Sequence, residues 1–98
     1  TLHSWGLGSS GQLGNNNATA NPNSPTQIGN LRDWSKITSI ATHALGVKTD
    51  GSLWSWGVNG SGQLGDVSVT TRSSPVMIGH FGSWTNVATG NTHSLTIT

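Results

Sequence analysis

The chain has no cysteine, no tyrosine and no glutamate, and only seven of its 98 residues carry a charge. Without cysteine, disulfides, thiolate metal sites and thiol nucleophiles are excluded, while the redox compartment stays open. The three carboxylates, Asp33, Asp50 and Asp66, are far apart in the sequence, and each lies in a predicted turn or loop. No constellation for acid–base or nucleophilic catalysis results. We therefore predict no enzyme activity, no catalytic residues and no cofactor.

Positive charge is as sparse as negative charge. The basic residues Arg32, Lys36, Lys48 and Arg72 are scattered, and the formal net charge is +1. Nucleic acids and anionic membranes need clustered positive charge, so neither is predicted as a partner. No apolar run approaches the about 20 residues of a membrane span, and no cationic and apolar leader opens the chain.

The start and the composition of the chain suggest its origin. Because the sequence starts with Thr1 rather than Met, we expect an excised or processed piece. The polar, lysine-poor composition is typical of bacterial secreted or surface β proteins. Composition alone assigns no compartment.

Glycine is abundant, with fourteen residues, and one glycine-rich stretch raises the question of a nucleotide site. GLGSSG, residues 6–11, matches the G-x-G-x-x-G fingerprint, which binds phosphate only after a strand and before a helix. Here no helical pattern follows, and the related stretch at 57–62 has Asn59 in place of Gly8. A pyrophosphate requires that glycine, whereas a turn residue with positive φ accepts Gly or Asn. We interpret both stretches as turns and predict no dinucleotide site.

The whole chain consists of two copies of one unit. Residues 2–14 and 53–65 are identical in nine of thirteen aligned pairs, and the similarity continues at an offset of 50 residues to the end. A period in this range is typical of solenoids, propellers and arrays. We divide the chain into a first unit, residues 1–51, and a second unit, residues 52–98, with blade boundaries circularly permuted relative to the repeats.

Short strands are predicted throughout each unit. KITSIA, ALGVKT and SLWSWG are β-branched or aromatic runs that alternate with polar residues, and Thr49-Asp50-Gly51 predicts a hairpin turn between the last two. A fourth run, PTQIG or PVMIG, begins after a proline, as an outer edge strand does. Four strands per repeat without a helix favour an all-β propeller blade.

The combination of these motifs resembles the RCC1 (regulator of chromosome condensation) repeat family. The pattern runs W-x-x-I/V, T-H-x-L-x-V/I, D-G-S-L-W-S-W-G, G-Q-L-G and P-x-x-I-G, and it covers essentially all 98 residues. Two positions depart from it: Ile40 replaces the glycine before the histidine, and His3 replaces the first Trp of SLWSWG. The resemblance implies a β-propeller and, for some relatives, guanine-nucleotide exchange on a GTPase, for which no residues carry over.

The two ends of the chain correspond to the two strands of one hairpin. Thr98 is equivalent to Lys48, and Thr1 is equivalent to Ser52, so only the turn between them is missing. Two blades cannot close a propeller of four to eight blades, and open sheet edges invite pairing with another chain. We expect a head-to-tail homo-oligomer in which residues 92–98 of one copy pair antiparallel with residues 1–5 of the next. The predicted pairing residues are Leu2, His3, Ser4, Trp5, His93, Ser94, Leu95, Thr96 and Ile97.

Whole pairs of blades permit only even totals. We favour a tetramer with eight blades over a trimer with six, because repeats of about 50 residues suit a wide ring. The alternative is a fragment of a longer chain with many blades.

Residues that recur at equivalent positions are assigned to the core. Two repeated histidines could bind a metal around the ring axis, but no Asp or Glu accompanies either one, so we favour a structural role and predict no metal. His3 and His80 have no counterpart and are predicted on the surface. The predicted structural core residues are Trp5, Trp34, His43, Trp56, Trp84 and His93.

The loops at residues 15–26 and 66–74 differ most between the units, and a binding face would lie there. Residues 17–19 and 59–61 match the glycosylation sequon. The sequence favours a non-enzymatic, self-assembling scaffold, with binding of another protein as a further use. The alternatives are a GTPase regulator of the RCC1 type and a surface module that binds a glycan or protein; the ligand is unknown.

Overall fold

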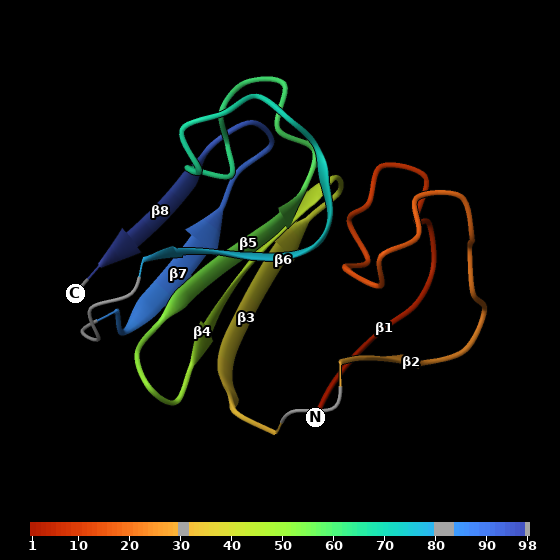
Figure 1. Ribbon diagram of the computed structural model, residues 1–98, viewed down its shortest axis with the longest axis horizontal. Helices are drawn as coiled ribbons and strands as arrows, with labels where there is room; N and C mark the ends of the chain where they lie inside the picture. The colour runs from red at the N-terminus through yellow and green to blue at the C-terminus, as the bar shows by residue number, and fades with distance from the viewer. Residues whose placement is uncertain (30–31, 80–83, 98) are drawn as a thin grey trace.

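The computed structural model describes residues 1–29, 32–79 and 84–97, and every regular element within these ranges is a β-strand (Figure 1). The all-β prediction is therefore confirmed. Within the same ranges there is no helix with the length and apolar character needed to cross a bilayer. The strands are β1 (Leu2–Ser4), β2 (Thr26–Ile28), β3 (Trp34–Ile40), β4 (His43–Lys48), β5 (Leu53–Gly57), β6 (Arg72–Gly79), β7 (Asn86–Thr89) and β8 (Ser94–Ile97).

The centre of the molecule is a four-stranded antiparallel sheet in the order β3-β4-β5-β6. The predicted hairpin connects β4 to β5: Gly51 has φ +82°, its N–H donates to the Lys48 carbonyl at 2.9 Å, and the Asp50 carboxylate accepts from Ser52 N–H. A left-handed residue of this kind is strained unless it is glycine. This turn sets the pairing of His43 with Gly57 and of Val47 with Leu53.

Strand β6 is longer than the sequence predicted. It starts at Arg72 rather than after Pro75, so the proline lies inside the strand. This is possible because β6 is the outer strand and pairs only with β5, leaving one edge on which no N–H is needed. The register against β5 shifts between Ser55 and Gly57, near this segment.

Two smaller sheets flank the central one, on opposite sides of it (Figure 1). The pair β1-β2 joins Leu2 to Ile28, and the pair β7-β8 joins Asn86 to Ile97. By sequence equivalence, β1-β2 matches the last two strands of the central sheet and β7-β8 matches the first two. The chain thus forms one complete blade, residues 34–79, between two half-blades; the division at residues 51 and 52 follows the sequence repeat and remains a prediction.

The core lies between the central sheet and the two half-blades. Trp34 makes edge-to-face contacts with Trp56 and Trp54, with ring centroids 5.7 and 6.2 Å apart. The Lys48 ammonium lies 4.2 Å from the Trp54 ring centroid and 3.6 Å from the Asp33 carboxylate, which extends the cluster to the surface. The buried apolar side chains are Leu13, Ile28, Ala44, Leu45, Val47, Leu53, Trp56 and Leu64.

Candidate functional site

The glycine-rich stretches form turns in both repeats. Gly11 N–H donates to the Gly8 carbonyl and Gly14 N–H to the Gly11 carbonyl, each at 3.1 Å. The second repeat has the same bonds from Gly62 and Gly65. No helix follows either stretch, so the helix N-terminus that would hold a pyrophosphate is absent from these described segments.

The prediction that a positive φ explains the exchange of Gly8 for Asn59 is wrong. Neither residue has a positive φ, so turn geometry does not explain the substitution. Gly8 is needed because the Ala20 carbonyl lies where a Cβ would stand. Asn59 instead has space and becomes fully buried. A buried asparagine is inaccessible as a glycosylation acceptor, which removes the second of the two sequons.

Asn59 organises the loop between β5 and β6. Its side-chain oxygen accepts from Leu64 N–H at 3.0 Å, and its amide nitrogen lies 3.0 Å from both the Asp66 carboxylate and the Thr70 carbonyl. Asp66 also accepts from the Ser68 hydroxyl at 2.6 Å and from Arg72 at 3.1 Å. These hydrogen bonds, led by that from Ser68, lower the pKa of Asp66 to about 2.

The GQLG motif has a specific structural role in each repeat. The side-chain oxygens of Gln12 and Gln63 accept from Ser10 N–H and Ser61 N–H, each at 2.8 Å, which closes the turn. Leu13 and Leu64 are buried, and their carbonyls accept from Ser4 and Ser55 hydroxyls at 2.8 Å. The motif therefore ties each turn to the strand that precedes it.

The carbonyls of the two glutamines are contacts that the sequence did not reveal. The Trp56 indole N–H donates to the Gln12 carbonyl at 3.0 Å, across the boundary between the β1-β2 half-blade and the central blade. The Ser94 hydroxyl donates to the Gln63 carbonyl at 2.7 Å, across the next boundary. A main-chain carbonyl is common to all residues, so the only sequence signal was the repetition of the motif itself.

His43 connects the central blade to the β7-β8 half-blade. It is fully buried, and its Nε2 lies 3.1 Å from the Ser94 hydroxyl, while Nδ1 has no hydrogen-bond partner among the residues that the structure describes. Burial lowers the pKa of His43, and the nearby His93 backbone partly opposes this effect. Within the described ranges, no group of three or more His, Cys, Asp or Glu side chains is arranged to hold a metal ion.

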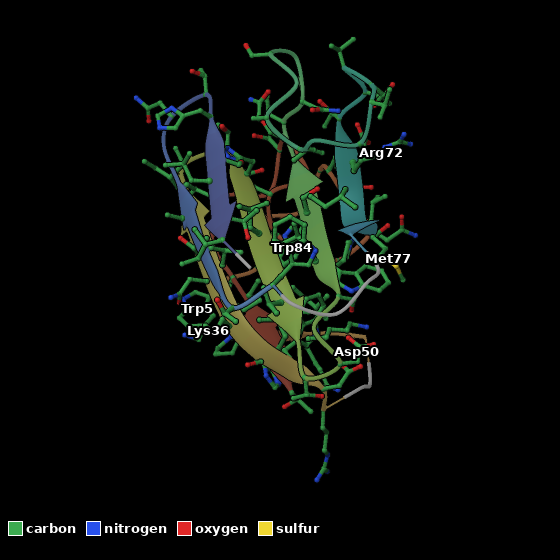
Figure 2. The ribbon with its side chains drawn as sticks, turned by 90° about the vertical axis from the view of Figure 1, so that its left-hand side faces the viewer. Trp5, Lys36, Asp50, Arg72, Met77 and Trp84 are labelled. Carbon is green, nitrogen blue, oxygen red and sulfur yellow. The ribbon has the colours of Figure 1, made fainter. Side chains whose placement is uncertain are left out.

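The predicted core residues differ in their burial. Trp56 and His43 are buried, whereas Trp34 and Trp84 are half-buried. Trp84 packs on Gly79 so closely that no Cβ would fit there, and Figure 2 shows it over the middle of the sheet, between Lys36 of β3 and Met77 of β6. Trp5, at 57% exposed, and His93 do not lie in the core of a single chain. Each belongs to a half-blade whose outer side is not covered by another blade among the described residues.

The outer edges of β1 and β8 lack a partner strand among the described residues. On β8, the carbonyls of His93 and Ile97 bond back toward β7, accepting from Gly90 and Thr85. Because backbone groups alternate along a strand, those of Ser94 and Thr96 point away from β7. By the same alternation, the backbone N–H and C=O groups of His3 and Trp5 point away from β2, since Gly6 N–H donates to the Pro22 carbonyl on the side of β2. Thr98 and His80, named in the sequence predictions, lie outside the described residues.

Apolar side chains are exposed beside these edges. Leu95 and Ile97 on β8 are 64% and 59% exposed, and Leu7 beyond β1 is 63% exposed. Two cavities adjoin the edges. One of about 380 Å³ lies beside β1 and includes Leu2, Leu13 and Trp56, and one of about 340 Å³ lies beside β8 and includes Leu45, Leu53 and Gln63. The edges and cavities suit the docking of further β-structure rather than the chemistry of a reaction.

These observations define the chain as a fragment of a β-propeller, with one complete blade and half of the blade on either side. The model of the family "Regulator of chromosome condensation (RCC1) repeat" matches residues 1–46 and 50–97. The chain belongs to the RCC1 repeat family, as its motifs predicted.

Known relatives and solved structures are similar to the chain over most of its length. It is 35% identical over 101 residues to the Arabidopsis thaliana ultraviolet-B receptor UVR8, and 40% identical over 60 residues to a Danio rerio RCC2 homologue. These matches cover 97% and 59% of this chain but only 22% and 12% of the relatives.

Among solved structures, Saccharomyces cerevisiae Prp20p, described with its binding to Gsp1p and histones, superposes with a TM-score of 0.80 at 24% identity. Human WBSCR16 superposes with a TM-score of 0.75 at 22% identity. The alignments cover 98% and 97% of this chain and 26% of each solved chain. They establish the RCC1-like propeller fold.

Proposed function

We propose that this chain is a non-enzymatic propeller scaffold that self-assembles by pairing β8 of one copy with β1 of the next. The observation that carries the proposal is the pair of complementary open edges, which lie on opposite sides of the central blade (Figure 1). That separation prevents β1 and β8 of one chain from pairing with each other. Such a head-to-tail contact must either close as a ring or extend as a fibre.

The central blade supplies the register of the new pairing. In it, His43 lies opposite Gly57, Leu45 opposite Ser55, and Val47 opposite Leu53. Transferring these pairs by the repeat offsets places His93 opposite Gly6, Leu95 opposite Ser4, and Ile97 opposite Leu2 of the next copy. The exposed Leu95 and Ile97 would then be buried between blades, as Leu45 and Val47 are within the chain.

A ring of whole chains contains an even number of blades. We favour four chains with eight blades over three chains with six. The mass of the particle in solution, measured by light scattering across a dilution series, distinguishes a tetramer from a trimer and both from the 10.1 kDa monomer.

A proline at position 96 tests the strand pairing directly. Thr96 directs its N–H away from β7, so Thr96→Pro removes a donor needed only by the incoming strand. Thr96→Ala is the matched control, because it loses the same side-chain bond to the Asn86 carbonyl but keeps the N–H. We expect Thr96→Pro to remain monomeric at concentrations where the wild type and Thr96→Ala assemble. Assembly of Thr96→Pro equal to that of Thr96→Ala would refute the proposed edge.

A second candidate function, binding of another protein, is favoured by the loop between β5 and β6. Val67 is fully exposed and Val69 is 68% exposed, on a loop that Asn59 and Asp66 hold in place. Titration with Gsp1p and with histones, the partners named for the yeast relative, tests this function. Saturable binding that is weakened by Val67→Asn supports it, and the absence of binding removes those two proteins as partners.

A further inference from the structure

Within the chain, a tryptophan from one blade docks onto the glycine-rich turn of the preceding half-blade. The Trp56 indole lies on Gly14, whose added Cβ would come within 2.7 Å of the indole nitrogen, and its N–H donates to the Gln12 carbonyl at 3.0 Å. Trp56 is only 2% exposed as a result. This contact has three parts: a flat indole, a glycine without a side chain, and a main-chain acceptor two residues before that glycine.

The second repeat contains the same turn, but no described tryptophan lies on its glycine, Gly65. Gly65 corresponds to Gly14 and has the same φ of +70°, yet the nearest atom to an added Cβ is Ile78 Cδ1 at 3.7 Å. The Gln63 carbonyl accepts from Ser94, and a carbonyl oxygen can accept a second hydrogen bond. Gln63 and Gly65 line the cavity of about 340 Å³ beside β8.

The matching tryptophan is exposed on the other side of the same molecule. Trp5 corresponds to Trp56 in the repeat and is 57% exposed. Figure 1 places β1, which leads into Trp5, on the far side of the central sheet from β8, so Trp5 cannot reach its own Gly65. A chain therefore carries an exposed tryptophan, Trp5, and an uncovered glycine turn, residues 63–65, on faces that a head-to-tail copy would bring together.

We infer that Trp5 of a second copy docks on the Gln63–Gly65 turn, where its indole packs on Gly65 and its N–H donates to the Gln63 carbonyl. This inference rests on the proposed self-assembly and adds the side chain that anchors it. Buried aromatic residues in desolvated pockets commonly dominate the affinity of an interface. Trp5 would therefore account for much of the affinity between copies, beyond the backbone pairing of β8 with β1.

Self-association of the full chain, measured by sedimentation velocity across a dilution series, tests the inference with variants on both sides of the contact. Trp5→Ala should raise the dissociation constant at least about tenfold, and Trp5→Phe, which keeps the ring but lacks the N–H, about two- to tenfold. Gly65→Asn should also raise the dissociation constant at least about tenfold, because Asn tolerates positive φ and its side chain would occupy the position of the docked indole. Gly29→Asn is the matched control, since Gly29 has φ +64° and open space around it, and it should assemble like the wild type.

A fluorine label reports the docking itself. In protein labelled with 5-fluorotryptophan, the resonance that Trp5→Phe removes should shift with concentration and lose its solvent isotope effect as the copies associate. The circular dichroism of dilute Trp5→Ala should match the wild type, because Trp5 is exposed in the single chain and its loss leaves the fold intact.

The outcomes separate the inference from the proposed function. If Trp5→Ala and Gly65→Asn assemble like the wild type while Thr96→Pro does not, the strands pair and the Trp5 anchor is wrong. An assembled wild type whose Trp5 resonance keeps its solvent isotope effect also overturns the anchor alone. A wild type that stays monomeric at every concentration overturns both.

Discussion

At the scale of single residues, the Ser94 hydroxyl makes two of the hydrogen bonds between the central blade and the β7-β8 half-blade. Ser94 donates to the Gln63 carbonyl and lies 3.1 Å from His43 Nε2, so from the β7-β8 half-blade it satisfies two buried groups of the central blade. The sequence predicted a structural role for His43 from its repetition alone. It could not predict Ser94 as the partner, because the equivalent residue in the first repeat is Ala44, which cannot form these bonds.

Replacing this hydroxyl should weaken the fold. Ser94→Ala leaves His43 Nε2 without a partner in a buried site, so we expect the free energy of unfolding to fall by about 1–3 kcal/mol. Urea denaturation, with the protein at concentrations too low for assembly, measures this change. Ser35→Ala, on an exposed position of β3, is the control and should change the free energy by less than about 0.5 kcal/mol. Equal midpoints for the two variants would contradict the role of Ser94.

At the scale of elements, the strands followed from local sequence, whereas the loop between β5 and β6 did not. Alternating β-branched and aromatic residues predicted β3, β4 and β5, and the Asp-Gly turn predicted the hairpin between β4 and β5. The loop instead has Val67 in the left-handed region with φ +62°, where a β-branched side chain is unfavourable. The equivalent Asn16 has φ +61°. In both repeats the preceding side chain closes a turn around this position, because Asp66 accepts from Ser68 N–H and Asn15 accepts from Asn17 N–H.

Relieving that conformation should stabilise the protein. Val67→Asn places a residue that tolerates the left-handed region at a position with no side-chain contacts to lose, since Val67 is fully exposed. We expect the free energy of unfolding to rise by about 1 kcal/mol. Val69→Asn makes the same chemical change at an exposed position without positive φ, and it should not raise stability. An equal gain in both variants would point to surface polarity and exclude backbone strain as the cause.

At the scale of the whole molecule, the blades are separate sheets joined by side chains. Lys36 donates to Asn86 at 2.8 Å, and Thr38 and Thr89 hydroxyls lie 3.3 Å apart, so polar contacts between β3 and β7 accompany the His43–Ser94 link. A protonated His43 would place an N–H on the unpartnered Nδ1 in a buried position. The contact between the central blade and the β7-β8 half-blade should therefore weaken in acid.

Mild acid should lower the stability of the whole chain. Because the pKa of His43 is lowered in the folded state, the unfolded chain binds more protons below the ordinary value of 6.5, and the free energy of unfolding decreases as pH falls below it. Urea midpoints between pH 7 and pH 5 measure the slope, which for one proton is at most about 1.4 kcal/mol per pH unit. His43→Gln keeps a donor but cannot titrate, so its midpoint should change less over this range. Identical slopes would show that other groups cause the acid dependence.

The sequence by itself determined the repeat, the strands, the propeller class and the RCC1 family, because these depend on local propensity and on a pattern that recurs at a fixed offset. Tertiary structure decided which of the equivalent residues are buried. Trp5 and Trp56 occupy the same place in the motif, yet one is 57% and the other 2% exposed, since only Trp56 has a neighbouring half-blade to cover it. Burial depends on what lies across the gap between sheets, and a repeat pattern carries no information about a surface that another blade must supply.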